Sequence, residues 1–252
     1  MSSAALTIDA AAPQISPERA PLLRWLIFTG LVVFAGVLLW RYRLLQTMLA
    51  ADRTYISVVI LALYVAASLH CLVRTVAIAR EAETARRDSA ALSGPAGADI
   101  LADGARTLPE GAVTAHIRNL VTKAQMRGAG QIDQTLLLRA LADRLRGSNG
   151  FGAFASDTLM KLGLLGTIVG FIIMLAPIAG LDASDKVGMR ASMGVMSDGM
   201  AVAMYTTLAG LVGSILIKIQ YYMLDAATQR VFAETVTLTE TRVTPVLERL
   251  HA

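Results

Sequence analysis

Three threonines are the side chains of this sequence best suited to moving an ion, because the stretches around them are otherwise apolar. Thr167 lies in GLLGTIVGFIIML at 163–175, and Thr206 and Thr207 lie in GMAVAMYTTLAGL at 199–211. A hydroxyl both donates and accepts hydrogen bonds, so it can solvate an ion or pass a proton. Neither stretch contains a charged residue or a histidine. A titratable group for ion transfer must therefore come from outside these two stretches.

Other kinds of chemistry have little basis in the sequence. The single cysteine, Cys71, cannot form an intrachain disulfide, and the three histidines are too scattered for a metal site. No nucleophile–base set or phosphate loop is present, so we expect neither an enzyme nor a cofactor. His70 and Cys71 are interpreted as helix-packing residues, because one neutral imidazole can be satisfied inside a bundle. A net charge of +4 is weak support for nucleic-acid binding, and none is expected.

The composition predicts an all-α membrane protein. Of 252 residues, 55% are hydrophobic and only 17% are charged, and the mean hydropathy is +0.56, which is too apolar for an ordinary soluble domain. The 20 glycines favour helices that pack closely in lipid.

Four stretches are long enough to cross the hydrocarbon layer as helices. They are Leu22 to Trp40, Tyr55 to Val73, Leu162 to Leu181 and Gly199 to Ile217. Trp40 and Tyr55 lie at span ends, where aromatic residues are typical.

The distribution of Lys and Arg predicts the orientation. The polar segment 79–158 is rich in arginine, which indicates the cytoplasm. Four spans then place both termini in the cytoplasm and leave 41–54 and roughly 182–198 as short outside loops. Arg41, Arg43 and Arg53 count against this orientation, but the inside regions hold the majority of the basic residues.

The predicted domain organisation has five parts. They are an N-terminal cytoplasmic segment at 1–21, transmembrane helices 1 and 2 at 22–78, a cytoplasmic loop at 79–158, transmembrane helices 3 and 4 at 159–217, and a cytoplasmic C-terminal helix at 218–252.

Inside the cytoplasmic parts, local signals predict further structure. Ser93 to Gly97 indicates a flexible break, and Asp133 to Arg146 indicates an amphipathic helix that ends at Gly147. That helix is expected to pack on neighbouring helices, with a partner-docking surface as the alternative. Pro245 is expected to bend or end the C-terminal helix.

The third and fourth spans each carry one face of small and hydroxyl-bearing residues. On the fourth span that face consists of Gly199, Ala203, Thr206, Thr207, Gly210, Gly213 and Ser214. On the third span it consists of Gly163, Gly166, Thr167, Gly170, Met174 and Pro177. Such faces allow close helix contact, so we expect the two to line one interface.

From pattern alone, two interpretations of these faces stay open. Small faces mostly serve helix packing, and a threonine in a membrane helix often bonds only its own backbone; the alternative is an ion path. Pro177 could kink the third span or expose a carbonyl. Asp198 is either an ordinary helix-start residue or a cation-attracting group at the mouth of a path.

At these residues the sequence resembles the MotA/TolQ/ExbB proton channel family. GLLGTIVGFIIML at 163–175 is similar to the third-helix signature of that family, and GMAVAMYTTLAGL at 199–211 is similar to the fourth helix of the stator subunits MotA and PomA. TolQ and ExbB carry a glutamate five residues before the fourth-helix threonine, where this chain has Val202. That difference argues against a close TolQ or ExbB relative. The layout of two early spans, a cytoplasmic loop and then the two signature spans is similar to the four-span MotA type.

The resemblance implies a function and a set of partners. Family members form homopentamers around two copies of a single-span MotB/TolR/ExbD-like subunit, whose helix carries an essential aspartate. The resemblance assigns ion-path roles to Thr167, Thr206 and Thr207, and it implies a bacterial inner-membrane motor driven by protons, with sodium as the alternative ion. The rival hypothesis is a non-transporting membrane scaffold whose glycine faces only pack helices.

Overall fold

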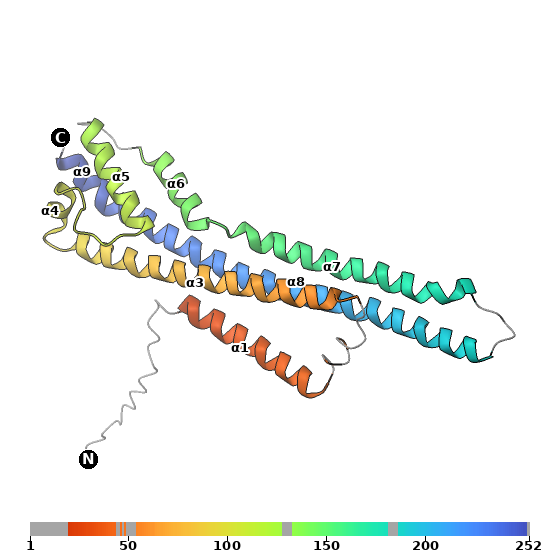
Figure 1. Ribbon diagram of the computed structural model, residues 1–252. Coiled ribbons are helices and arrows are strands. Elements are labelled where there is room, and N and C mark those ends of the chain that lie inside the picture. Colours follow the sequence, from red (N-terminus) through yellow and green to blue (C-terminus); the bar gives the residue numbers. More distant parts are fainter. Residues whose placement is uncertain are drawn as a thin grey trace, which may run out of the picture.

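The computed structural model describes residues 20–43, 46, 48, 54–127, 133–180 and 186–250. Within these residues every regular element is helical (Figure 1). The predicted N-terminal segment 1–21 lies outside them except for its last two residues, and so does most of the predicted outside loop 41–54.

Three helices are long and apolar enough to cross a membrane, judged by length and composition. These are α3 (Ile56–Ser93), the helix that begins with α7 (Gly150–Leu175), and the helix that contains α8 (Lys186–Leu238). The first helix, α1 (Ala20–Arg41), contains a shorter apolar run at Trp25–Arg41. The described part of the chain therefore fits the predicted class of α-helical membrane proteins.

Two of these helices are much longer than a bilayer is thick. α3 has 38 residues and α8 has 53, which correspond to about 57 Å and about 80 Å at 1.5 Å per residue, against a hydrocarbon layer of ~30 Å. Figure 1 shows α3 and α8 side by side, with α7 along α8. Each long helix can therefore link a membrane part to a polar part without a break.

This continuity corrects two sequence expectations. Residues 79–93, predicted as part of a loop, continue α3, because the Ala-, Arg- and Glu-rich run has no glycine or proline before Gly94. Residues 186–198, predicted as part of an outside loop, form the first turns of α8. That stretch also lacks proline, so nothing in the backbone ends the helix where the apolar span ends.

Residues 150–158, also predicted as part of the loop, form the first turns of α7. Between α3 and α7, the described part of the predicted loop contains three further helices. They are α4 (Gly97–Ala102), α5 (Ala112–Arg127) and α6 (Thr135–Arg146). The amphipathic α6 buries Leu141 and Leu145, leaves Leu136 exposed, and ends at Gly147 with φ of +47°. Because that φ lies in the left-handed region, glycine suits the position.

The C-terminal helix passes Pro245 without ending. A π-helical turn, η2 (Thr239–Val243), follows α8 and leads into α9 (Thr244–Leu250). Proline cannot donate the usual backbone hydrogen bond, and a π turn before it accommodates the misfit. The predicted bend therefore takes the form of a local change of helix type.

Helices α4, α5, α6 and α9 gather around the ends of α3 and α8 (Figure 1). We call this part the polar-end bundle. Its core consists of large apolar side chains that are almost fully buried, among them Leu101, Val113, Ile117, Leu120, Val121, Leu224, Val243 and Leu247. Burial of this kind is the usual basis of stability in a water-exposed domain.

A buried polar cluster joins α3 to α5 inside the bundle. Asp88 is 0% exposed and accepts a hydrogen bond of 2.6 Å from the Thr114 hydroxyl. About two turns before Asp88 on α3, the carboxylate of Glu81 accepts a hydrogen bond from the backbone N–H of Ala112, at 2.9 Å and 3.1 Å from its two oxygens. This bond caps the start of α5. Burial raises the pKa of Asp88, and the Glu81 charge raises it further.

Candidate ion path along the α7–α8 interface

Helices α7 and α8 approach so closely that backbone touches backbone. A Cβ added at Gly199 would lie 2.5 Å from the Met174 nitrogen and 2.7 Å from the Gly170 oxygen. A Cβ at Gly170 would lie 2.6 Å from the Gly199 oxygen and 2.8 Å from the Ala203 Cβ. Only glycine fits at these two positions, because the neighbouring atoms are backbone that cannot move aside.

The same close contact continues toward the polar end. A Cβ at Gly210 would lie 2.6 Å from the Leu159 oxygen and 2.8 Å from the Gly163 Cα. At Gly213 the nearest atom would be 3.6 Å away, which is an ordinary contact. The structure thus brings the predicted faces of the two helices together, with Gly213 at the loosest point.

Thr206 lies inside this interface. Its side chain is 0% exposed and packs onto Gly166, where a Cβ would fall 2.2 Å from the threonine Oγ1. The hydroxyl donates to the carbonyls of Val202 at 2.8 Å and Ala203 at 3.2 Å. This is the geometry of a packing residue whose polar group is satisfied within its own helix.

Thr207, the next residue, faces outward. Its side chain is exposed, and its hydroxyl reaches across the interface to the carbonyl of Gly163 at 3.2 Å while also approaching the Ala203 carbonyl at 3.0 Å. The bond to Gly163 joins α8 to α7 at the surface of the pair.

Thr167 lies one helical turn beyond Gly163 on the same face of α7. It is half-buried, and its hydroxyl donates to the Leu164 carbonyl at 2.5 Å. In an α-helix the Gly163 carbonyl also accepts the backbone N–H of Thr167. The Gly163 carbonyl therefore accepts both the hydroxyl of Thr207 and the backbone N–H of Thr167. We call these two threonines and the Gly163 carbonyl, at the edge of the interface, the polar spot.

Pro177 and Asp198 lie apart from the threonines. The α-helix α7 ends at Leu175, and Pro177 belongs to the following 3-10 helix η1 (Ala176–Gly180), so it lies after the helix rather than at a kink within it. Asp198 is exposed and lies twelve residues inside α8, because that helix begins at Lys186. It is therefore not a helix-start residue.

A second pair of hydroxyls lies deeper along the same interface. Ser156 of α7 and Ser214 of α8 are both buried, and their Oγ atoms are 3.0 Å apart. The sequence analysis placed Ser214 on the small face but left Ser156 out, because it precedes the predicted third span. The continuation of the small face one turn at a time toward the polar end is the signal that could have found it.

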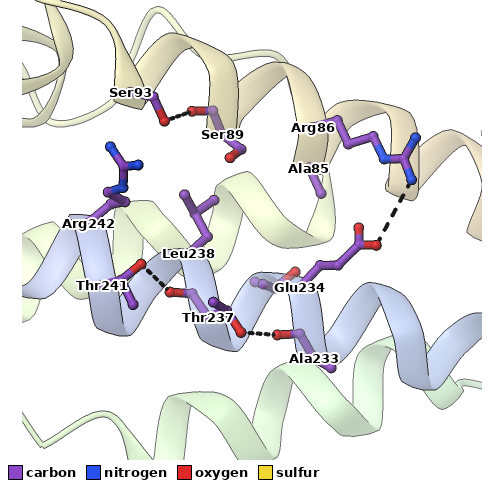
Figure 2. Close-up of a pocket in the computed structure, with 11 residues that line it drawn as sticks. Ala85, Arg86, Ser89, Ser93, Ala233, Glu234, Thr237, Leu238, Thr241 and Arg242 are labelled. Carbon is purple, nitrogen blue, oxygen red and sulfur yellow. Dashed lines mark hydrogen bonds and ion pairs between the residues drawn. The ribbon is translucent and has the colours of Figure 1, made fainter.

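A groove of about 590 Å³ lies elsewhere, between α3 and the end of α8 (Figure 2). Arg86 and Glu234 form an ion pair of 3.9 Å there, and Thr237 and Thr241 donate to carbonyls of their own helix. Glu234 is 27 residues past Thr207 on α8, about 40 Å along the helix. The groove is thus separate from the threonine region.

Comparison with protein-family models matches residues 110–236 to the MotA/TolQ/ExbB proton channel family. The matched range is half of the chain and runs from the start of α5 nearly to the end of α8, so it includes the whole α7–α8 interface. Comparison with curated proteins gives no match, and comparison with solved structures gives none. With the glycine interface and its threonines inside the matched range, the chain belongs to the MotA/TolQ/ExbB proton channel family.

Proposed function

We propose that this chain is the proton-conducting subunit of an ion-driven motor in a bacterial inner membrane. It works as a homopentamer around two copies of a single-span subunit whose membrane helix carries an aspartate. Proton movement past that aspartate is coupled to rotation or other mechanical work. All four apolar helices, α1 included, cross the membrane, with both termini in the cytoplasm.

The observation that carries this proposal is the polar spot formed by Thr167, Thr207 and the Gly163 carbonyl. It lies at the edge of two apolar helices, and neither span contains an acidic side chain. Two hydroxyls without an acid can hydrate or orient a carboxylate that another subunit supplies. They cannot by themselves carry charge through hydrocarbon, so the titrating group is the partner's aspartate.

The three threonines divide the work by their exposure. Thr207 is exposed and Thr167 is half-buried at the edge of the interface, and both contact the partner's aspartate or its water. Thr206 faces inward onto Gly166 and holds the two helices at the spacing that presents the other two hydroxyls. Its contribution to the ion path is therefore positioning.

The first experiment is purification of the complex from native membranes, with native mass spectrometry to identify the partner and its copy number. The complex is then reconstituted in liposomes, and proton uptake is measured under an imposed membrane potential. We expect Thr207→Val to lower the flux by about a hundredfold and Thr167→Val by about tenfold, because valine keeps the shape and removes the hydroxyl. A separate measurement of sodium uptake at the same membrane potential tests the alternative ion.

Thr158→Val is the matched control. Thr158 also lies on α7, is half-buried like Thr167, and donates its hydroxyl to its own backbone at 2.7 Å from the Phe154 oxygen, but it lies before the predicted span. Its variant should conduct like the native protein. A pentamer that assembles with no aspartate-bearing companion and shows no flux would favour the scaffold. A native flux that survives both Thr207→Val and Thr167→Val would overturn the roles assigned to the threonines.

A further inference from the structure

We propose that His70, Tyr221 and Ser148 form the last proton relay of the path, carrying protons from the α7–α8 interface to the cytoplasm. This proposal rests on the channel function proposed above and adds the exit residues to it. His70 belongs to α3, Tyr221 to α8 and Ser148 to the turn between α6 and α7. The relay therefore lies where the apolar helices meet the polar-end bundle.

The three side chains form an unbroken chain of hydrogen bonds. His70 Nδ1 lies 2.7 Å from the Tyr221 hydroxyl, and His70 Nε2 lies 2.9 Å from the Ser148 hydroxyl. The imidazole and the tyrosine ring are nearly parallel, at 13° with centroids 6.2 Å apart, and the Phe151 ring lies at 5.0 Å from the imidazole in an edge-on arrangement. Gly152 makes room for the tyrosine, because a Cβ there would fall 2.1 Å from the ring.

Because His70 is hydrogen-bonded to two hydroxyl groups, both of its neutral tautomers are available. A histidine bonded to a carbonyl or a carboxylate is held in one tautomer, since such groups only accept. Here both ring nitrogens face hydroxyls, which can donate or accept. When Nδ1 carries the proton, the Tyr221 hydroxyl can donate instead to the Ala67 carbonyl at 3.4 Å. Neither state leaves a polar atom of the relay unpaired.

The relay runs from a buried group to the water-exposed surface. Tyr221 is 5% exposed, His70 is half-buried, and Ser148 is exposed. Tyr221 also lines a groove of about 750 Å³, together with Asp143, Asn149 and Asp225. Asp225 is exposed and accepts a hydrogen bond of 2.9 Å from Asn149, so a carboxylate is present at the exit to receive the proton.

Hydroxyls on α8 connect the relay to the threonine region. Thr207, Ser214 and Tyr221 are spaced by seven residues each, so they lie on nearly the same face at intervals of about 10 Å. The hydroxyls of Ser156 and Ser214 lie between Thr207 and Tyr221 and pass the proton from one to the other.

The transfer balances without any other reactant. A proton arriving at the Tyr221 oxygen allows the tyrosine hydroxyl to give its own proton to Nδ1. At the same time Nε2–H gives its proton to the Ser148 oxygen, and the Ser148 hydroxyl proton leaves to water. The ring remains neutral with its proton on Nδ1, and because it is half-exposed it regains the starting tautomer by exchange with water.

The test uses the reconstituted complex and the same proton-uptake measurement. We expect Tyr221→Phe and His70→Gln each to lower the flux by about tenfold or more, while pentamer assembly stays intact. Phenylalanine keeps the ring on Gly152, and glutamine keeps hydrogen bonds but cannot exchange tautomers. Tyr222→Phe is the matched control, since Tyr222 is the neighbouring tyrosine and is 76% exposed; its flux should equal that of the native complex.

Chemical rescue separates a relay from a structural role. External imidazole should restore flux to His70→Ala, because it can carry protons between Tyr221 and Ser148, and it should not restore Thr207→Val. If Thr207→Val loses flux while His70→Gln and Tyr221→Phe keep it, the relay is wrong and the channel function holds. Assembled His70→Ala that imidazole does not rescue also overturns the relay. A native complex without proton flux would remove both proposals.

Discussion

The polar-end bundle and the α7–α8 interface are held together in different ways. In the bundle, large apolar side chains such as Ile117 and Leu120 are 0% exposed and fill the space between helices. At the α7–α8 interface, Gly170 and Gly199 bring backbones into contact and leave the large apolar residues, such as Ile172, on the outside. In water, the hydrophobic effect favours burial of large apolar side chains. In lipid this effect is absent between helices, and association depends on van der Waals contact, which close packing of small residues increases.

This difference has a consequence for function. A glycine interface leaves few side chains between α7 and α8, so the hydroxyls of Thr207 and Ser214 on α8 reach polar atoms of α7, namely the Gly163 carbonyl and the Ser156 hydroxyl. A bundle core of leucines would exclude such groups, because a polar group there would lose its hydrogen bonds. The packing that suits lipid therefore also suits an ion path.

The largest effect on stability is expected from a cavity-forming substitution in the core of the polar-end bundle. Ile117→Ala should lower the free energy of unfolding by about 2–5 kcal/mol, because it removes buried methylene groups and leaves a cavity. Thermal unfolding of the detergent-solubilised protein, followed by circular dichroism, measures the loss. Leu136→Ala on α6 is the control, since Leu136 is 69% exposed; equal losses in both variants would contradict the assigned core.

A smaller effect is expected at the α7–α8 interface, where adding a carbon atom, rather than removing one, should destabilise the protein. Gly199→Ala should lower the free energy of unfolding by about 1–3 kcal/mol, because its Cβ would collide with α7 backbone. Gly194→Ala, five residues earlier on the same helix, has nothing within 4 Å and should stabilise by up to about 1 kcal/mol through helix propensity. The difference between their thermal midpoints checks the comparison, and equal midpoints would refute the close contact.

The smallest effect is a pH dependence confined to the bundle. Because the folded-state pKa of Asp88 is raised above its value of 3.8, the folded protein binds this proton more tightly than the unfolded protein. Stability from Asp88 is therefore present at low pH and is lost as pH rises from about 4 through the raised pKa. In the folded protein Glu81 and Arg118 are the charged groups acting on this carboxyl.

Asp88→Asn removes that titration. The difference in unfolding midpoint between the native protein and Asp88→Asn should shift against the native protein as pH rises over this window. Thermal scans of both proteins at several pH values between 4 and 8 give the difference directly, so titrations elsewhere in the chain cancel. A difference that is independent of pH would show that Asp88 is not the buried acid described here.

The sequence predicted the family through the resemblance of its stretches 163–175 and 199–211. It predicted the two small faces for a simple physical reason. Helical period decides which residues share a face, and small residues on such a face allow contact. The same rule could not find where the long helices end. Span length follows the hydrocarbon thickness, whereas a helix continues until glycine, proline or a cap ends it, so α3 and α8 run far past their apolar stretches.

The sequence by itself thus predicted a helical membrane chain of the MotA/TolQ/ExbB family, with Thr206 and Thr207 both assigned to the ion path. Only the tertiary structure distinguished their positions, because adjacent residues on a helix point about 100° apart and Thr206 alone of the two is buried, against Gly166 of α7. Only the tertiary structure brought His70 to Tyr221, 151 residues later in the chain. A periodic pattern gives the direction of a side chain on its own helix, and the group it meets is set by how the helices pack.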